Sequence, residues 1–225
     1  IPILEVPGYE ADDVIGTLAT LAGKKQIPTY MMTPDKDYGQ LVSDCVFMYR
    51  PKYGDKEFEV MGVEEVKAKF SIASPLQVID MLGLMGDSAD NIPGCPGVGE
   101  KTAQKLIAEF GSIENLLEHT DQLTGAIRTK VETNREQLSF SKFLATIKTD
   151  VPIELDLDAL KRESPNESEL RKIFEELEFR TLLERVFKTE KKPEAKGPAM
   201  QGDLFGFFTD GPTEETKNSN LTRLE

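Results

Sequence analysis

The sequence contains little cysteine and little histidine, and these shortages exclude several kinds of site. Its 225 residues include two cysteines, Cys45 and Cys95, and one histidine, His119. Two cysteines cannot form a disulfide framework or a four-ligand zinc site, so we expect a reducing, cytoplasmic compartment. A single histidine excludes any mechanism that needs one histidine as a base and another as a metal ligand.

Long apolar runs and a leader segment are absent as well. No apolar run approaches the ~18–20 residues that cross a bilayer, so we expect no membrane partner. The first residues, Ile1-Pro2-Ile3-Leu4, show neither the basic nor the apolar region of a secretory signal. They also lack an initiator methionine, and we expect the chain to be a cropped or processed one.

Basic residues are scarce relative to acidic ones. The chain has 27 of the former and 40 of the latter, a net charge of −13. The first 98 residues carry 8 basic and 15 acidic side chains, residues 99–148 carry 7 of each, and the rest carry 12 and 18. The first segment is therefore expected to attract cations, and the middle segment is the least repulsive to a polyanion.

Helix and strand patterns alternate over the first 85 residues. The apolar spacing predicts helices over 10–22, 37–42, 63–70 and 75–84, and strands over 28–33, 45–49 and 56–60. The turn residues Tyr53-Gly54-Asp55 predict that the strand over 56–60 is a hairpin partner of the preceding strand. The alternation as a whole favours an α/β layer with a mainly parallel sheet. Everything after residue 86 has a helical pattern until Lys188, where the composition becomes typical of a linker.

Acidic residues gather in three clusters. One opens the first predicted helix, at Gly8–Asp13; Asp35 and Asp37 follow the strand over 28–33; Asp87 and Asp90 lie three apart on a predicted helical turn. Ligands bind outside the carboxyl ends of parallel strands, and converging carboxylates need a hard cation such as Mg²⁺, Mn²⁺ or Ca²⁺. Two such ions can hydrolyse a phosphodiester. The alternative is that each cluster only caps a helix or is solvated.

Two familiar ligand-binding loops are excluded. An EF-hand starting at Asp35 would need glycine at its sixth position, where Gln40 stands. A P-loop needs lysine directly after its last glycine, but Glu100 separates Gly99 from Lys101.

The glycine-rich segment from Gly94 to Gly99 is better explained as a hairpin between two helices. Its backbone N–H groups at a helix N-terminus could bind one nucleic-acid phosphate, with Lys101 and Lys105 adding positive charge. The alternative is a hairpin that only turns the chain.

Three segments together resemble a known family. They are VPGYEADDVIGTLA (Val6–Ala19), TPDKDYGQLVSD (Thr33–Asp44) and LGLMGDSADNIPGCPGVGEKTAQKLI (Leu82–Ile107). In this order and spacing they resemble the 5′-nuclease (5′→3′ exonuclease) domains of bacterial DNA polymerase I, which are related to flap endonucleases. The resemblance extends to about Phe187. It implies a partial PIN-like α/β nuclease domain over 1–85, a helix-three-turn-helix DNA-binding subdomain over 86–187, and a flexible linker toward a polymerase body over 188–225.

The resemblance also implies the site residues and the partners. Two Mg²⁺ or Mn²⁺ ions would be held by Glu10, Asp12, Asp13, Asp35, Asp37, Asp87 and Asp90. DNA would be contacted by Gly94, Gly97, Val98, Gly99, Lys101, Thr102 and Lys105. The substrates would be 5′ flaps, nicks and RNA primers in DNA replication and repair, cut by a monomer.

The family supplies two further aspartates from strands that would precede Ile1. We therefore expect the isolated chain to be inactive. A non-catalytic, structure-selective DNA-binding module and an interaction linker remain as alternatives.

A short peptide in the linker resembles another known motif. Gln201-Gly202-Asp203-Leu204-Phe205 is similar to the peptides by which bacterial replication proteins bind the sliding clamp. Leu204 and Phe205 would fill an apolar pocket, and Gln201 would form a hydrogen bond at its rim. The alternative is an apolar patch that packs on a neighbouring domain.

Overall fold

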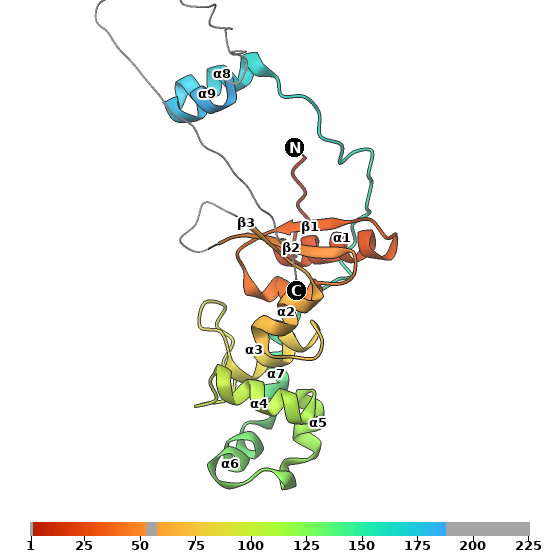
Figure 1. Ribbon diagram of the computed structural model, residues 1–225, viewed down its shortest axis with the longest axis vertical. Helices are drawn as coiled ribbons and strands as arrows, with labels where there is room; N and C mark the ends of the chain where they lie inside the picture. Colours follow the sequence, from red (N-terminus) through yellow and green to blue (C-terminus); the bar gives the residue numbers. More distant parts are fainter. Residues whose placement is uncertain (1, 53–57, 188–225) are drawn as a thin grey trace, which may run out of the picture. The chain divides into compact units, whose positions relative to one another are not determined.

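The computed structural model describes residues 2–52 and 58–187 of the chain (Figure 1). Two compact units are distinguished, Ile1–Glu163 and Ser164–Glu225, and each is described by itself. Among the helices that the structure describes, none has the length and apolar character needed to span a bilayer. The predicted clamp-binding peptide lies outside the described residues.

The first unit contains a three-stranded sheet in the order β1-β2-β3, formed by β1 (Thr29–Met32), β2 (Val46–Pro51) and β3 (Phe58–Met61). β1 runs parallel to β2, whereas β2 and β3 are antiparallel. The sheet is thus mixed: the prediction of a mainly parallel sheet was wrong, whereas the predicted hairpin partner is confirmed by the antiparallel pairing of β2 with β3. A short connection joins β2 to β3, and such a connection allows only an antiparallel return.

The two faces of the sheet differ in burial. Met31, Met48 and Met61 point into the core and are at most 4% exposed. The alternate positions carry exposed side chains, Tyr30, Met32, Phe58 and Val60. On this face the ring of Tyr30 stacks on that of Phe47 at 5.3 Å, and Tyr49 stacks on Phe58 at 4.8 Å.

The predicted helices of the α/β part are present with small shifts at their ends. They are α1 (Ala11–Lys24), the 3-10 helix η1 (Lys36–Leu41), α2 (Val63–Phe70) and α3 (Gln77–Met85). The buried face of α1 includes Val14, Ala19 and Ala22, as its apolar spacing predicts. In Figure 1 the sheet and α1 lie at one end of this unit, and α4 to α6 lie at the other.

The helical part is built around α3 and comprises α4 (Glu100–Phe110), α5 (Ile113–Glu118), η2 (Thr120–Gln122), α6 (Gly125–Thr133) and α7 (Arg135–Ala145). α3 packs so closely on α7 that a Cβ atom on Gly83 would lie only 3.1 Å from the Cα atom of Lys142. The absence of a side chain at Gly83 therefore permits this contact. Val78, Leu82 and Leu84 of α3 are fully buried. One hydrophobic core therefore runs from the sheet to α7 without interruption.

The segment between α7 and α8 is not helical, which corrects the prediction of helix throughout this region. Its backbone groups bond to distant side chains. The amide N–H of Ile147 donates to Gln40 Oε1 at 2.9 Å, and that of Val151 donates to Thr17 Oγ1 at 3.2 Å. These partners replace the hydrogen bonds that a helix would have supplied.

The second unit contains α8 (Glu167–Glu176) and α9 (Arg180–Phe187) within its described residues. The rings of Phe179 and Phe187 both lie near that of Phe174, with centroids 6.3 and 6.4 Å from it. The guanidinium group of Arg171 lies 4.2 Å from the ring centre of Phe187. Aromatic and cation–π contacts thus join the two helices.

Candidate metal centre and nucleic-acid interface

A hollow of about 260 Å³ gathers most of the predicted acidic residues where α1, η1 and the end of α7 meet. Five carboxylates line it, those of Glu10, Asp12, Asp13, Asp37 and Asp90. Ile92 and residues 144–147 complete its wall. The ligands predicted at the start of α1 and in η1 are therefore brought together with Asp90, which is distant from them in sequence.

Three carboxylates approach one another most closely. Oxygen atoms of Asp37, Asp87 and Asp90 all lie within 4.8 Å of one another. Asp37 is 8% exposed, and among the described residues its Oδ1 has no hydrogen-bond partner. Burial, together with the negative charge of Asp35, raises the pKa of Asp37 to about 6. This arrangement suits a hard divalent cation, which would neutralise the carboxylates and bind the Asp37 oxygen that has no hydrogen bond.

Asp87 and Asp90 lie in a tight loop after α3. The N–H of Asp87 donates to the carbonyl of Ile92 at 2.9 Å, and the N–H of Ile92 returns a bond of 2.8 Å to the carbonyl of Asp87. Asp87 Oδ1 also accepts from the N–H of Ala89 at 2.8 Å. The prediction of a helical turn here was wrong, because a backbone bridge between Asp87 and Ile92 closes the loop. Gly86, which precedes the bridge, adopts a φ angle of +73°.

Lys36 is the residue of this cluster that the sequence argument missed. Its ammonium group forms an ion pair with Asp87, and its Nζ lies 3.9 Å from Asp37 Oδ1. The hydrogen bond from Lys36 holds the pKa of Asp87 below its usual range. The signal was its position between Asp35 and Asp37. Lys36 partly neutralises the cluster in the absence of a metal ion.

Three of the remaining acidic residues accept hydrogen bonds from other residues of the protein. Asp12 Oδ1 accepts from the hydroxyl of Tyr38 at 2.7 Å, and Asp13 Oδ1 accepts from the N–H of Lys148 at 2.9 Å. Asp35 caps η1, because its Oδ1 accepts from the N–H of Asp37 at 3.0 Å. Asp35 is not among the residues that line the hollow.

The glycine-rich segment follows the acidic loop directly, and part of it is buried. Gly94 is enclosed: its N–H donates to Ser141 Oγ at 3.0 Å, and its carbonyl accepts from Gln137 Nε2 at 2.7 Å. Val98 is 4% exposed, and its N–H donates to the carbonyl of Cys95. The N–H groups of Gly94 and Val98 are therefore used inside the fold and do not face a ligand.

The exposed part of the segment carries the features that a phosphate would need. Gly97, Gly99, Lys101 and Lys105 are exposed, and Thr102 is half-buried at the start of α4. Lys130 of α6 was not predicted, but its Nζ donates to the carbonyl of Gly97 at 3.2 Å. Lysine side chains from α4 and α6 thus flank the same helix N-terminus, where an anion is favoured.

Two family profiles match consecutive parts of the chain. Residues 1–71 match the profile described as "5'-3' exonuclease, N-terminal resolvase-like domain". Residues 73–168 match the one described as "5'-3' exonuclease, C-terminal SAM fold".

The chain is also similar to curated proteins. It is 46% identical over 183 residues to DNA polymerase I of Bacillus subtilis, and the match covers 81% of this chain and 21% of that protein. It is 41% identical over 209 residues to the thermostable DNA polymerase I of Thermus filiformis, and the match covers 91% and 24%. The chain thus spans a fifth to a quarter of the length of these relatives.

Solved structures share the fold. The T5 5′-exonuclease with bound zinc aligns with a TM-score of 0.58 at 23% identity, over 66% of this chain and 54% of that one. A bacteriophage T5 flap endonuclease, in a complex with DNA and metal ions, aligns with a TM-score of 0.58 at 22% identity and the same coverage. The predicted fold class, an α/β nuclease layer followed by a helical subdomain, is confirmed.

Proposed function

Because the chain belongs to the 5′-3′ exonuclease family, within the group found in bacterial DNA polymerase I, we propose that it is a metal-dependent 5′-nuclease module. Its reaction is hydrolysis of phosphodiesters at 5′ flaps or nicks, in DNA or RNA primers, during replication and repair. The observation that carries the proposal is the group of three carboxylates within 4.8 Å of one another, including a buried oxygen of Asp37 that has no hydrogen bond among the described residues.

The donor set fits Mg²⁺ or Mn²⁺. Both ions prefer carboxylate oxygens, and the described cluster offers three of them together with the carboxylates that line the same hollow. We propose that Asp37, Asp87 and Asp90 hold one ion, and that Glu10, Asp12 and Asp13 contribute to a second. Divalent ions bound here would supply a nucleophile at neutral pH and stabilise the leaving oxygen.

The residues of the chain itself bind and orient the substrate. The N-terminus of α4 and the side chains of Lys101, Lys105 and Lys130 bind backbone phosphates without reading the bases. Lys36 pairs with Asp87 and favours its ionised form, which is the form that a cation binds. The space around Gly99, before the first residue of α4, is open: a Cβ atom there would meet no heavy atom within 4 Å.

Several finer assignments belong to the same proposal. The chain acts as a monomer in the cytoplasm, and the helix-three-turn-helix subdomain over 86–187 binds duplex DNA behind the cut. The 225 residues alone do not cleave at ordinary rates. Clamp binding through Gln201, Leu204 and Phe205 stays a hypothesis.

The second candidate function is structure-selective DNA binding without catalysis. One observation favours it: Lys36 already satisfies Asp87, so part of the acidic cluster is neutral without a metal ion. The two functions differ in their response to divalent ions, because a module that only binds DNA does not need metal ions at the acidic cluster.

Calorimetric titration with Mn²⁺ separates the two functions. We expect the unaltered chain to bind Mn²⁺, and the Asp37→Asn and Asp90→Asn variants to bind it about tenfold or more weakly, because each loses a charged ligand. The matched control is Asp121→Asn, an exposed aspartate of η2 that lies outside the hollow.

Cleavage of a labelled 5′-flap duplex in Mg²⁺ then tests the reaction itself. It is to be measured with the 225-residue chain and with a longer chain extended at its N-terminus. Activity of the longer chain that disappears in Asp90→Asn is the expected result. Equal Mn²⁺ binding by all variants, together with no cleavage by either chain, would favour the DNA-binding function.

A further inference from the structure

Helix α7 is attached to the glycine-rich segment through Gly94. Ser141 Oγ accepts from the N–H of Gly94 at 3.0 Å, and Gln137 Nε2 donates to its carbonyl at 2.7 Å. Ser141 is fully buried and Gln137 is half-buried. Both polar groups of this one peptide position are thus held by side chains four residues apart on the same face of α7.

The C-terminal end of α7 is attached to the acidic hollow. The carbonyl of Ala145, the last residue of α7, accepts from Gln40 Nε2 at 2.9 Å, and the N–H of Ile147 donates to Gln40 Oε1 at 2.9 Å. Gln40 belongs to η1, the element that carries Asp37. Residues 144–147 also form one wall of the hollow. The end of α7 therefore has a fixed position relative to Asp37.

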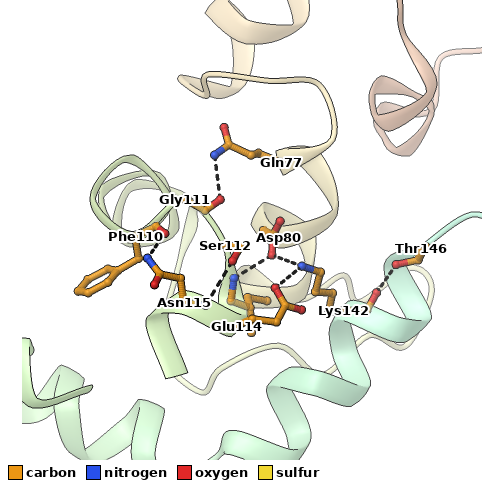
Figure 2. A network of polar contacts seen from close by, with 10 residues as sticks. Gln77, Asp80, Phe110, Gly111, Ser112, Glu114, Asn115, Lys142 and Thr146 are labelled. Atoms are coloured by element: carbon orange, nitrogen blue, oxygen red, sulfur yellow. Dashed lines mark hydrogen bonds and ion pairs between the residues drawn. The ribbon is translucent and has the colours of Figure 1, made fainter. Parts of the chain in front are cut away.

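The middle of α7 is fixed against rotation by charged groups (Figure 2). Lys142 Nζ lies 2.6 Å from Asp80 Oδ1 of α3 and 2.7 Å from Glu114 Oε2 of α5. Asp80 also accepts from the N–H of Ile113 at 2.9 Å. Gly83 of α3 packs against the backbone of Lys142 without space for a side chain. These contacts prevent α7 from sliding or turning on α3.

We propose that Gln137 and Ser141 are positioning residues that act through α7. They hold the glycine-rich segment, together with the acidic loop to which it is joined, at a fixed distance from Asp37 and the rest of the hollow on η1, so that one DNA strand engages the phosphate-binding segment and the carboxylates together. Gln137 and Ala145 are eight residues apart, which corresponds to about 12 Å along an α-helix. The inference rests on the proposed function, but it concerns the coupling of two sites rather than either site alone.

The test is the effect of Mn²⁺ on DNA affinity, measured by fluorescence anisotropy with a labelled 5′-flap duplex and the full 225-residue chain. Intact DNA is verified on a gel after each titration. In the unaltered chain we expect Mn²⁺ to raise the affinity about tenfold, a coupling free energy of ordinary size. In the Ser141→Ala, Gln137→Met double variant we expect an increase of less than about twofold.

Two separate titrations make this result specific. The double variant should bind Mn²⁺ alone, and DNA alone in EDTA, as tightly as the unaltered chain does. The matched control is Ser139→Ala, since Ser139 is exposed and its hydroxyl bonds only to the carbonyl of Arg135 within α7 among its described contacts. This control should retain the full effect of Mn²⁺.

Each other outcome overturns a defined statement. If the double variant keeps the tenfold effect, Gln137 and Ser141 do not position the sites. If its DNA affinity in EDTA falls as much as its affinity in Mn²⁺, the two residues only stabilise the fold, and the inference is wrong. If the unaltered chain binds neither Mn²⁺ nor DNA, the proposed function itself fails.

Discussion

The ionised side chain of Asp37 destabilises the fold but is well placed to bind a cation. Its side chain is buried, one oxygen has no hydrogen bond among the described residues, and its pKa is raised to about 6. A raised carboxyl pKa means that ionisation destabilises the folded state. The penalty is absent below the ordinary value of 3.8, grows between that pH and 6, and is complete above it.

The Asp37→Asn variant should therefore be more stable than the unaltered chain when metal is removed. We expect a gain of about 1 kcal/mol at pH 8 in EDTA, which disappears near pH 4, where Asp37 is already protonated. Urea unfolding at the two pH values measures the difference. Asp121→Asn, a substitution outside the hollow, is the control, and an Asp37→Asn variant that is less stable than the unaltered chain at pH 8 would contradict the argument.

At the scale of elements, α3, α5 and α7 meet around the ion pair between the buried carboxylate of Asp80 and Lys142. Asp80 is 5% exposed and meets both Lys142 Nζ and the N–H of Ile113. Replacing Lys142 with methionine keeps the aliphatic stem but leaves the carboxylate of Asp80 with one neutral donor. Removing one partner of a buried pair is costly because the other charge stays buried.

We expect Lys142→Met to lower the free energy of unfolding by about 2–4 kcal/mol at pH 7, measured in urea. The control is Lys161→Met, which removes a pair with Asp158 whose two side chains are 74% and 87% exposed. That change should cost less than about 0.5 kcal/mol. Equal effects of the two substitutions would show that the buried pair does not hold the helices together.

The same elements show how far the sequence predicts this fold. Helices α1, α2 and α4 follow from apolar spacing and turn residues, because each buries one face against the core. The extended segment after α7 does not follow, because its backbone partners are Gln40 and Thr17, which lie more than 100 residues away. Local patterns contain no information about partners at that distance.

The acidic cluster was predictable in its residue types but not in its geometry. The positions of Asp37, Asp87 and Asp90 were expected from the sequence, and the structure brings them within 4.8 Å. Asp35 caps η1 through a hydrogen bond from the N–H of Asp37, only two residues along the chain. The pairing of Asp87 with Lys36, in contrast, depends on how η1 meets the loop after α3. That meeting is a tertiary contact, so spacing alone could not separate caps from candidate ligands.

At the scale of the whole molecule, the net charge of −13 sets how DNA binding depends on salt. An acidic chain gains little from long-range attraction, so binding depends on a few local contacts made by Lys101, Lys105 and Lys130. We expect log K for flap DNA to fall with log salt with a slope of about −3 in EDTA. In the Lys101→Ala, Lys105→Ala double variant the slope should become about −1.

Anisotropy titrations over a series of KCl concentrations measure both slopes. Lys161→Ala serves as the control, because its side chain is exposed in the segment after α7 and lies far along the sequence from the α4 N-terminus. An unchanged slope in the double variant would mean that other cations bind the phosphates.

The backbone bridge between Asp87 and Ile92 has a consequence for protein engineering. Because Gly94 lies against Gly86, with no space for a Cβ atom on either glycine, the acidic loop and the glycine-rich segment form one inseparable cassette. Grafting the carboxylates alone onto another scaffold would leave Asp87 without its backbone partner Ile92. Residues 86–99 must be transplanted as a unit, and lengthening one half would shift the register of the other.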